Sequence, residues 1–233
     1  MHQGARPLIS TIVPVYNGER YLAAALESAL GQRYRPIELV VVNDGSTDGS
    51  AEVSRKYAGQ VRYFHQPHAG AGRARNAGVD LATGAYFAFL DADDLWPPDR
   101  LERQMEALDA DGSLDIVYGQ MQQFISPELP DAVKARLRCP LGNMPSRLPS
   151  TMLIRRDAFF RVGYFGLTIG EAVDWAMRAT ELGVNSTMLS ALVLKRRVHA
   201  TNRSMLTRET RSEYVKYVKA SLDRRRAQNC ERD

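Results

Sequence analysis

In the first half of the chain, short runs of apolar residues alternate with longer segments whose apolar residues recur at helical spacing. Residues 8–13, 37–42 and 85–90 have the length and near-continuous hydrophobicity of buried strands. A chain that alternates strands and helices in this way folds as a mostly parallel sheet covered by helices on both faces. The other elements predicted in this half are a helix at 18–30, a helix at 47–57, a strand at 61–65, a helix at 73–81 and a helix that begins at Pro97.

The second half of the chain has a less regular pattern. Residues 126–150 contain five prolines, which predicts an irregular excursion with one short helix at 132–137. After it we expect a strand at 151–155, a helix at 171–182, a strand at 192–198 and a terminal helix at 207–226.

The length and composition fit one globular domain with a small elaboration. The 233 residues are 44% hydrophobic and 25% charged, which are ordinary values for a chain that buries its own core. The two cysteines, Cys139 and Cys230, do not form a CxxC pair, so we expect neither a disulfide framework nor a zinc–thiolate site. We see no signal peptide and no apolar stretch of about 18 residues, and we therefore expect a cytoplasmic protein.

Positive charge is concentrated near the C-terminus. Residues 195–226 contain eleven Lys or Arg and three acidic residues, a net charge of +8, although the whole chain carries only +4. A basic tail suggests nucleic-acid binding in general, but the motifs upstream point elsewhere, and we expect no nucleic acid partner. The remaining alternatives are a solvated helix face and contact with an anionic surface.

The strongest motif is FLDADD at residues 89–94, which closes a predicted buried strand. Three carboxylates within four positions, Asp91, Asp93 and Asp94, repel one another and are costly to bury unless a cation compensates them. A hard divalent ion held by one or two carboxylates and by phosphate oxygens meets that requirement. The alternative is an acidic cluster that stabilises the N-terminus of the helix at Pro97.

A second polar segment, NDGSTDGS at residues 43–50, follows the second predicted strand. Gly45 permits a tight turn, and Ser46 or Thr47 is placed to cap the following helix. The carboxylate of Asp44 can accept a hydrogen bond from a nucleobase N–H. Ligands of parallel α/β sheets bind at the carboxyl ends of the strands, where this segment and FLDADD both lie.

Two further segments carry weaker signals. Tyr16 follows the first strand and can stack on a planar base or simply pack at a turn. Arg75 lies in the small and basic segment 70–78 and can meet a phosphate or a base, or project from an ordinary helix. The glycines of this segment do not form a dinucleotide-binding fingerprint, because no GxGxxG directly follows a strand.

Together these segments resemble the family 2 glycosyltransferases with the GT-A fold. The resemblance covers roughly residues 8–205 and rests on four motifs in order: VPVYN at 13–17, VVNDGSTD at 41–48, ARNAG at 74–78 and FLDADD at 89–94. It implies an α/β fold with a Rossmann-like, mostly parallel central sheet flanked by helices and with a C-terminal helical extension. It also implies metal-dependent, inverting transfer from a nucleoside diphosphate sugar, for which we expect UDP, to an acceptor hydroxyl in polysaccharide or other glycoconjugate synthesis.

The resemblance also implies roles for individual residues. The nucleotide pocket is expected to contain Pro14, Val15, Tyr16, Asn17, Asp44, Gly45, Arg75, Asp91 and Ala92. Asp91 also lies near the metal, which is Mn²⁺ or Mg²⁺, and Asp93 ligates it. His199, within RVHATN at 197–202, is expected to supply a neutral nitrogen ligand to the metal or to touch the diphosphate.

The catalytic base is the place where this chain departs from the family pattern. The family commonly carries a Glu–Asp pair that opens a helix below the acceptor site, and its Asp is the base. Here Glu171 is followed by Ala172, so the role falls to Asp174 or to Glu171, which share one helical face. We expect Asp174 to be the base, because the ring of Trp175 can shield it from water, and we expect Glu171 to orient the acceptor.

The expected organisation is a transferase domain at 1–206 followed by a basic helix and tail at 207–233. The domain divides into a nucleotide-binding half at about 8–120 and an acceptor half at about 121–206. The expected partners are the nucleotide-sugar donor and an acceptor. The terminal helix is expected to contact the inner face of a membrane or a second copy of the chain.

Two other functions remain open from the sequence. A sugar nucleotidylyltransferase also needs a metal and a nucleotide pocket, but it usually has a glycine-rich basic loop directly after the first strand, and PVYNG at 14–18 is no such loop. A nucleotide-sugar-binding protein without turnover is favoured by the missing carboxylate at Ala172.

Overall fold

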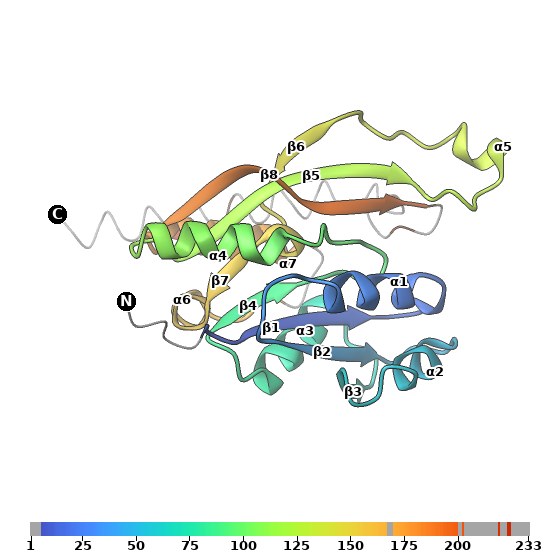
Figure 1. Cartoon of the computed structure of the whole chain (residues 1–233), viewed down its shortest axis with the longest axis horizontal. Helices are drawn as coiled ribbons and strands as arrows, with labels where there is room; N and C mark the ends of the chain where they lie inside the picture. The colour runs from blue at the N-terminus through green and yellow to red at the C-terminus, as the bar shows by residue number, and fades with distance from the viewer. Residues whose placement is uncertain (1–5, 167–169, 200–201, 203–218, 220–222, 225–233) are drawn as a thin grey trace.

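The computed structural model describes residues 6–166, 170–199, 202, 219 and 223–224. The strands of this part of the chain form one eight-stranded sheet of order β3-β2-β1-β4-β7-β5-β6, in which β8 pairs with β5. Figure 1 shows β1 to β4 in the lower part of the molecule and β5, β6 and β8 in the upper part. The sheet therefore divides into two halves that are built differently.

The first half contains four parallel strands. They are β1 Ile9–Val15, β2 Ile37–Asp44, β3 Arg62–Gln66 and β4 Tyr86–Phe89. The helices of this half are α1 Glu19–Leu30, α2 Ser50–Arg55, α3 Ala71–Leu81 and α4 Arg100–Ala110. β1 pairs in parallel with β2 and with β4, and β2 pairs in parallel with β3. The predicted parallel sheet with covering helices is confirmed here, and the four strands end at one edge.

The second half contains mixed pairings. Its strands are β5 Ile116–Ile125, β6 Asn143–Ser146, β7 Leu153–Arg155 and β8 Ser186–Val198. Its helical segments are α5 Asp131–Lys134, the 3-10 turn η1 Pro149–Thr151, α6 Arg156–Val162 and α7 Glu171–Glu181. β7 runs antiparallel to β4 and to β5, whereas β8 runs parallel to β5.

The sequence pattern missed β5 and β6, and it placed the start of β8 at residue 192 rather than at Ser186. Only the first part of β5 is fully buried, so the rest has the polar composition of a strand with one solvated face. Gly119 interrupts its apolar run because a side chain there would collide with Val193 of β8. β6 lies within the proline-rich segment and pairs with β5, so part of the predicted irregular excursion is regular sheet.

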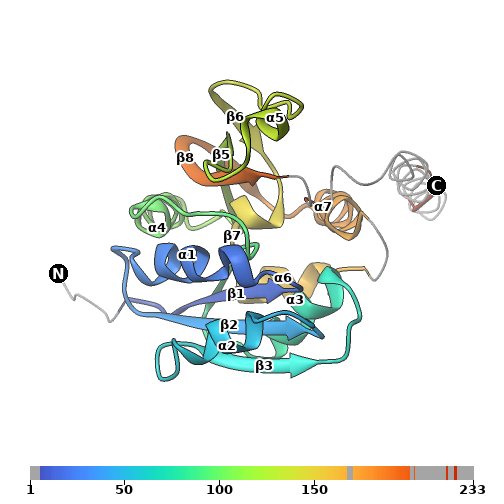
Figure 2. The same ribbon diagram turned by 90° about the vertical axis from the view of Figure 1, so that its right-hand side faces the viewer.

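Alternate side chains of the strands face two separate layers of helices. Ile9, Val13 and Val15 of β1 belong to a core shared with α1 and α4. Ile12 belongs to a second core, shared with α3, α6 and α7. Figure 2 shows α4 and α7 on opposite sides of β7, so the sheet is covered on both faces and its carboxyl edge is left for the loops.

One predicted helix cap is wrong. Neither Ser46 nor Thr47 caps a helix at 47, because α2 begins only at Ser50, whose N–H is accepted by Asp48. The loop before α2 is occupied instead by contacts with the loop that follows β1.

The predicted terminal helix at 207–226 lies outside the described residues, apart from residues 219 and 223–224. None of the helices in the described part of the chain is long and apolar enough to cross a membrane.

Candidate active site

The loops that follow β1 and β2 are joined at the carboxyl edge of the sheet. Asn17, whose φ is 50°, accepts the backbone N–H of Thr47 on its side-chain oxygen at 2.8 Å. The backbone N–H groups of Asn17 and Gly18 donate to the hydroxyls of Ser46 and Ser50, both at 3.0 Å. Asparagine tolerates the left-handed conformation better than most residues, so Asn17 serves here as a connector between the two loops.

The end of β1 changes from buried to exposed within one residue. Pro14 and Val15 are buried, whereas Tyr16 is 50% exposed. The Tyr16 ring stacks on the His68 imidazole, with ring centroids 4.0 Å apart and an interplanar angle of 27°. Of the four residues predicted at this strand end, which include Asn17, Tyr16 is the one that presents an accessible aromatic surface.

Asp44, the last residue of β2, is buried and hydrogen-bonded on both oxygens. Its Oδ1 accepts Gln66 Nε2 at 2.7 Å and the Ala69 N–H at 2.9 Å. Its Oδ2 accepts the Gly70 N–H at 2.8 Å and lies 2.9 Å from His68 Nδ1. The carboxylate therefore organises the connection between β3 and α3.

Gly45 lets this connection approach β2. Its φ is 74°, and a Cβ at this position would lie 2.6 Å from the backbone nitrogen of His68. Only glycine adopts this conformation without strain and leaves room for the neighbouring main chain. The predicted turn at Gly45 is present, and it brings His68 next to Asp44.

Arg75 of α3 links the two halves of the molecule. Its Nη2 donates to Asp91 Oδ1 at 2.8 Å, after β4, and its Nη1 donates to Glu171 Oε1 at 3.0 Å, at the start of α7. Burial lowers the pKa of Arg75, but the charges of Asp91 and Glu171 outweigh it and raise the pKa overall. The guanidinium is therefore a permanent cation held between two carboxylates.

The close approach of α3 and α7 depends on Gly72. A Cβ at this position would lie 2.2 Å from the carbonyl oxygen of Gly166 and 3.2 Å from Cγ of Glu171. A larger residue would displace the segment before α7, so Gly72 helps to keep Glu171 within reach of Arg75.

Asp93 is held by residues at the end of β8 and just beyond it. His199 Nε2 lies 3.0 Å from Asp93 Oδ2, and Asn202 Nδ2 donates to the same oxygen at 3.1 Å. Both partners are buried, and the His199 ring also contacts the Tyr21 ring of α1, with centroids 4.7 Å apart. The tertiary structure thus places His199 beside the acidic motif, as expected for a residue of the same site.

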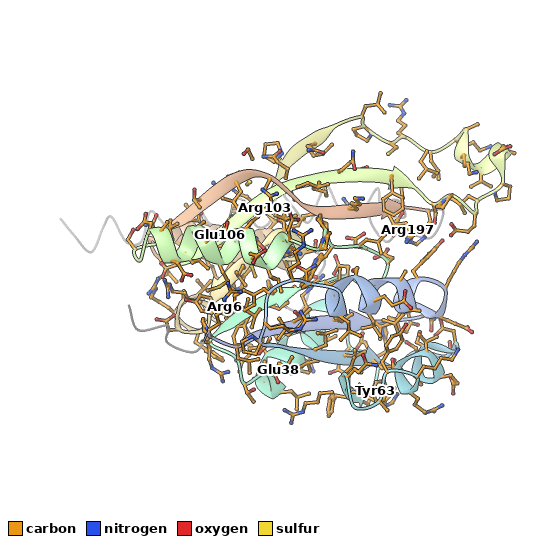
Figure 3. All side chains as sticks on the ribbon, in the orientation of Figure 1. Arg6, Glu38, Tyr63, Arg103, Glu106 and Arg197 are labelled. Carbon is orange, nitrogen blue, oxygen red and sulfur yellow. The ribbon has the colours of Figure 1, made fainter. Side chains whose placement is uncertain are left out.

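Asp94 is the buried member of the acidic motif. Its Oδ1 accepts the backbone N–H of Arg197 at 2.9 Å. Burial raises the pKa of Asp94, and the negative charges of Asp93 and Asp91 raise it further. Figure 3 shows Arg197 on β8, above α1. Asp94 therefore ties the motif to β8, and Asp91 and Asp93 keep about a third of their side-chain surface exposed.

Asp91, Asp93 and His199 carry donor atoms of the types that bind divalent cations. Carboxylate oxygens are ligands of Mg²⁺ and Mn²⁺, and imidazole nitrogens bind many divalent transition metals. The 3.0 Å between Asp93 Oδ2 and His199 Nε2 is about the separation of adjacent ligands around an octahedral ion with bonds of about 2.1 Å. In the described part of the chain, no three His, Cys, Asp or Glu residues are grouped to hold an ion. The residues present fit a cation that takes one or two ligands from the protein.

Asp174 and Glu171 lie on the same helix but have different partners. Asp174 Oδ2 accepts Arg178 Nε at 3.0 Å, and the Arg178 guanidinium also donates to the carbonyl oxygens of Val162 and Tyr164. Among the described residues, no hydrogen bond or ion pair joins Asp174 to Arg75 or to the acidic motif. Of the two acids predicted near the acceptor, Glu171 is the one that the fold connects to Arg75 and, through it, to Asp91.

Trp175, which the sequence placed beside Asp174 as a shield, is part of the core. Its ring packs against Phe159 and Phe165, and its indole N–H donates to the carbonyl oxygen of Gly163. The main role of Trp175 in this structure is to fix α7 against α6.

The structure adds two residues that the motifs did not assign. Asn202 donates to Asp93, and its place three residues after His199 in RVHATN is the signal that could have marked it. His68 contacts Asp44 and Tyr16. No motif marked His68, because its position depends on the turn at Gly45 and not on a residue pattern.

The sequence of this chain matches one protein family and several known glycosyltransferases. The model of the family described as Glycosyl transferase family 2 matches residues 10–165, which contain all four motifs: VPVYN, VVNDGSTD, ARNAG and FLDADD. An uncharacterized glycosyltransferase of Rickettsia typhi is 34% identical over 206 residues, which cover 83% of this chain and 64% of that protein. The chondroitin synthase of Pasteurella multocida is 30% identical over 243 residues, which cover 97% of this chain and 24% of that protein. This chain spans less than two thirds of the length of either relative.

Two solved structures share the fold. A complex of S. aureus TarS with UDP-GlcNAc matches with a TM-score of 0.71 and 21% identity, covering 85% of this chain and 61% of that chain. A complex of the mannosyltransferase PcManGT from Pyrobaculum calidifontis with GDP-Man and Mn²⁺ matches with a TM-score of 0.65 and 23% identity, covering 84% of this chain and 59% of that chain. These likenesses confirm the predicted α/β fold of the GT-A type.

The family model covers well over half of the chain, and a relative at more than 30% identity covers most of it. These matches set aside the sugar nucleotidylyltransferase that the sequence left open. The chain belongs to glycosyl transferase family 2.

Proposed function

We propose that the chain transfers a sugar from a nucleoside diphosphate sugar, with UDP as the nucleotide, to an acceptor hydroxyl by a metal-assisted single displacement with inversion. The observation that carries this proposal is the buried Arg75, which bridges Asp91 and Glu171. Asp91 belongs to the candidate donor and metal site, and Glu171 begins the helix that carries the candidate base. One guanidinium therefore fixes the donor side of the reaction relative to the acceptor side.

The nucleotide half provides what a nucleobase needs. The exposed Tyr16 ring offers a stacking surface, and the Asp44 carboxylate is a hydrogen-bond acceptor for a ring N–H. Gly18 and Ala92 bring the loops after β1 and β4 together, because a Cβ on Gly18 would lie 3.4 Å from that of Ala92. The solved neighbours were crystallised with UDP-GlcNAc and GDP-Man, which supports a donor of the same class here.

The acidic motif supplies the candidate metal site. One or two of the candidate ligands Asp91, Asp93 and His199 would hold Mn²⁺ or Mg²⁺, and the PcManGT structure contains Mn²⁺. A bound ion of this kind stabilises the negative charge that grows on a departing diphosphate. The chain's own side chains keep the ligands in place, because Asn202 and His199 fix Asp93 and Arg75 fixes Asp91.

Glu171 is better placed than Asp174 to accept the acceptor's proton, which reverses our preference from the sequence. Its Oε1 is bound by Arg75, and its Oε2 has no hydrogen-bond partner among the described residues. One oxygen is therefore available for an acceptor hydroxyl, as general-base catalysis requires. Asp174 is paired with Arg178 and lies 3.6 Å from Arg224, so its contacts position α7.

The decisive experiment measures release of the nucleoside diphosphate. The full chain is incubated with a panel of UDP- and GDP-sugars, in MnCl₂ or in EDTA, with and without simple sugar acceptors. We expect one donor to be cleaved, at least about tenfold faster with manganese than with EDTA because the ion stabilises the leaving group. Equal rates in manganese and EDTA would contradict the metal dependence.

A second candidate function follows from Ala172. This residue stands where the family offers its base, and it lines a mainly apolar groove of about 490 Å³ between α7 and β6, with Met121, Leu148, Val173 and Met177 among its neighbours. A methyl group cannot take a proton, which favours a protein that binds nucleotide sugars without turnover. Tight donor binding with no cleavage in the same panel would support this alternative over the transferase.

The acceptor and the C-terminal segment remain part of the proposal. The likeness to a chondroitin synthase supports an acceptor in polysaccharide synthesis. Arg224, one of the few described residues of this C-terminal region, donates to Glu181 Oε2 of α7 at 2.7 Å. For the predicted terminal helix at 207–226, we expect the basic face to bind an anionic membrane or the apolar face to pack against a second copy of the chain. Co-sedimentation with anionic vesicles at low salt tests the first version, and sedimentation velocity tests the second.

A further inference from the structure

The hydrogen-bonding capacity of Asp44 is fully used within the protein. A carboxylate offers about four lone-pair sites, and Asp44 has four contacts: Gln66 and Ala69 on Oδ1, and Gly70 and His68 on Oδ2. The Asp44 side chain is only 3% exposed. A nucleobase that donates to this carboxylate must therefore replace one of the existing donors.

His68 is the donor that can leave at the lowest cost. Ala69 and Gly70 donate through the main chain at the start of α3, so moving them would unwind the helix entry. Gln66 lies on β3 and is fixed by pairing with Asp44 in the sheet. The His68 side chain is 53% exposed and can turn into solvent by rotating about its own bonds.

In the conformation seen in the structure, the His68 side chain makes the contacts that a nucleobase would make in the proposed pocket. It is a planar ring that stacks on Tyr16 at a centroid distance of 4.0 Å. Its Nδ1 lies 2.9 Å from Asp44 Oδ2 and 3.0 Å from the Asp44 carbonyl oxygen. Both neighbours are acceptors, so Nδ1 must carry the proton and the ring acts as an N–H donor.

The main chain holds His68 in this position. Gly45, whose φ is 74°, packs directly against the His68 backbone. A Cβ at Gly45 would lie 2.6 Å from the backbone nitrogen of His68 and 3.1 Å from the Cα of His68. The Cα of His68 therefore stays close to Asp44 when the ring moves. The ring remains available to return whenever the pocket empties.

We propose that His68 is an internal competitor of the donor nucleobase, which occupies the Tyr16–Asp44 pocket in the free protein and swings out when the nucleotide binds. This inference rests on the proposed function, because it takes the Tyr16–Asp44 pocket to be the nucleobase site. The competition reduces the apparent affinity for the nucleotide by the fraction of molecules in which the pocket is open. A nucleobase that stacks on Tyr16 and donates a ring N–H to Asp44 replaces both contacts that His68 loses.

The test is calorimetric titration of the full chain with UDP in MnCl₂, on wild type and on three variants. His68→Ala removes the competitor and is expected to tighten Kd by about three- to tenfold, which corresponds to a pocket that is closed in most free molecules. His65→Ala is the matched control, because His65 is an exposed histidine on β3 with no part in the pocket. It is expected to leave Kd within about twofold of wild type. His68→Phe keeps a ring for Tyr16 but cannot donate, so it is expected to fall between wild type and His68→Ala.

The outcomes separate this inference from the function it rests on. If wild type binds UDP but His68→Ala binds it equally or more weakly, while its thermal melting is unchanged, His68 is not a competitor. If wild type does not bind UDP, the proposed function itself fails and the inference falls with it. An NMR spectrum of the histidine side chains adds a direct readout. Saturating UDP is expected to move the His68 ring signals toward those of a solvent-exposed histidine, and unchanged His68 signals at saturation would overturn the inference.

Discussion

The two halves of the candidate site are assembled over different distances along the chain. In the nucleotide half, Asp44 reaches Gly70 across 26 residues, within one β–α unit and its neighbour. On the metal and acceptor side, His199 reaches Asp93 across 106 residues. The first half depends on short loops at the ends of parallel strands, whereas the second depends on correct assembly of the whole sheet.

Because of this difference, substitutions in the two halves should change different measurements. A change in the loops after β1 or β2 should affect donor binding and leave the chemistry of the bound donor intact. A change at the contacts of Glu171 should affect turnover and leave nucleotide affinity nearly unchanged, whereas a change at Asp93 should abolish turnover and also weaken the metal-dependent part of donor binding. The predictions below test this separation.

The largest effect is expected for Asp93→Asn. The substitution removes the anionic oxygen that His199 and Asn202 hold in place. Loss of several kcal/mol of stabilisation of the leaving group corresponds to a fall in turnover of at least about a thousandfold. Steady-state donor cleavage in MnCl₂ measures it, and Asp99→Asn is the matched control, because Asp99 directly precedes α4 and pairs with the exposed Arg103. Turnover near the wild-type rate would remove Asp93 from the metal site.

The next effect distinguishes the two acids of α7. Glu171→Gln is expected to lower kcat by at least about a hundredfold, as loss of a general base commonly does, with Kd for UDP unchanged. Asp174→Asn is expected to lower kcat far less, because its partners are Arg178 and Arg224. Single-turnover transfer with both variants decides between them. The reverse ranking would restore Asp174 as the base.

A smaller effect, confined to the nucleotide half, is expected for Asp44→Ala. Losing a hydrogen bond to a charged acceptor costs about 1.5–3 kcal/mol, so UDP should bind roughly ten- to a hundredfold more weakly. The kcat at saturating donor is expected to stay near wild type. Calorimetry gives the affinity, and a thermal melt reports how far loss of the loop contacts also destabilises the fold. A parallel loss of kcat would show that the two halves are not separable.

The smallest effect is expected at the junction of the halves. Gly72→Ala would place a Cβ 2.2 Å from the Gly166 carbonyl oxygen, which should cost about 1–3 kcal/mol of unfolding free energy. A displaced Glu171 should lower kcat by about tenfold, since misplaced catalytic groups lose rate. Gly112→Ala, which meets nothing within 4 Å, is the control for both measurements. Unchanged kcat in Gly72→Ala would argue against the role of this contact in placing Glu171.

Sequence patterns predicted the parallel half of the sheet well for a physical reason. Strands buried on both faces leave continuous apolar runs, and polar residues directly after them mark the edge where ligands bind. The positions of Tyr16, Asp44 and Asp91 at strand ends followed from that rule. The second half was predicted less well because β5 is only partly buried and β6 lies among prolines, so neither has the periodicity of a core strand.

By itself, the sequence determined that the chain builds parallel β–α units with acidic residues at their ends, because hydrophobic periodicity and turn chemistry act over a few neighbouring residues. The tertiary structure alone decided the partners of the charged groups. Three contacts join separate elements. Arg75 bridges Asp91 and Glu171, Asn202 donates to Asp93, and His68 occupies the Tyr16–Asp44 pocket. Their geometry depends on strand order, on helix packing and on the close approaches that Gly45 and Gly72 permit, and none of these is encoded in a local pattern.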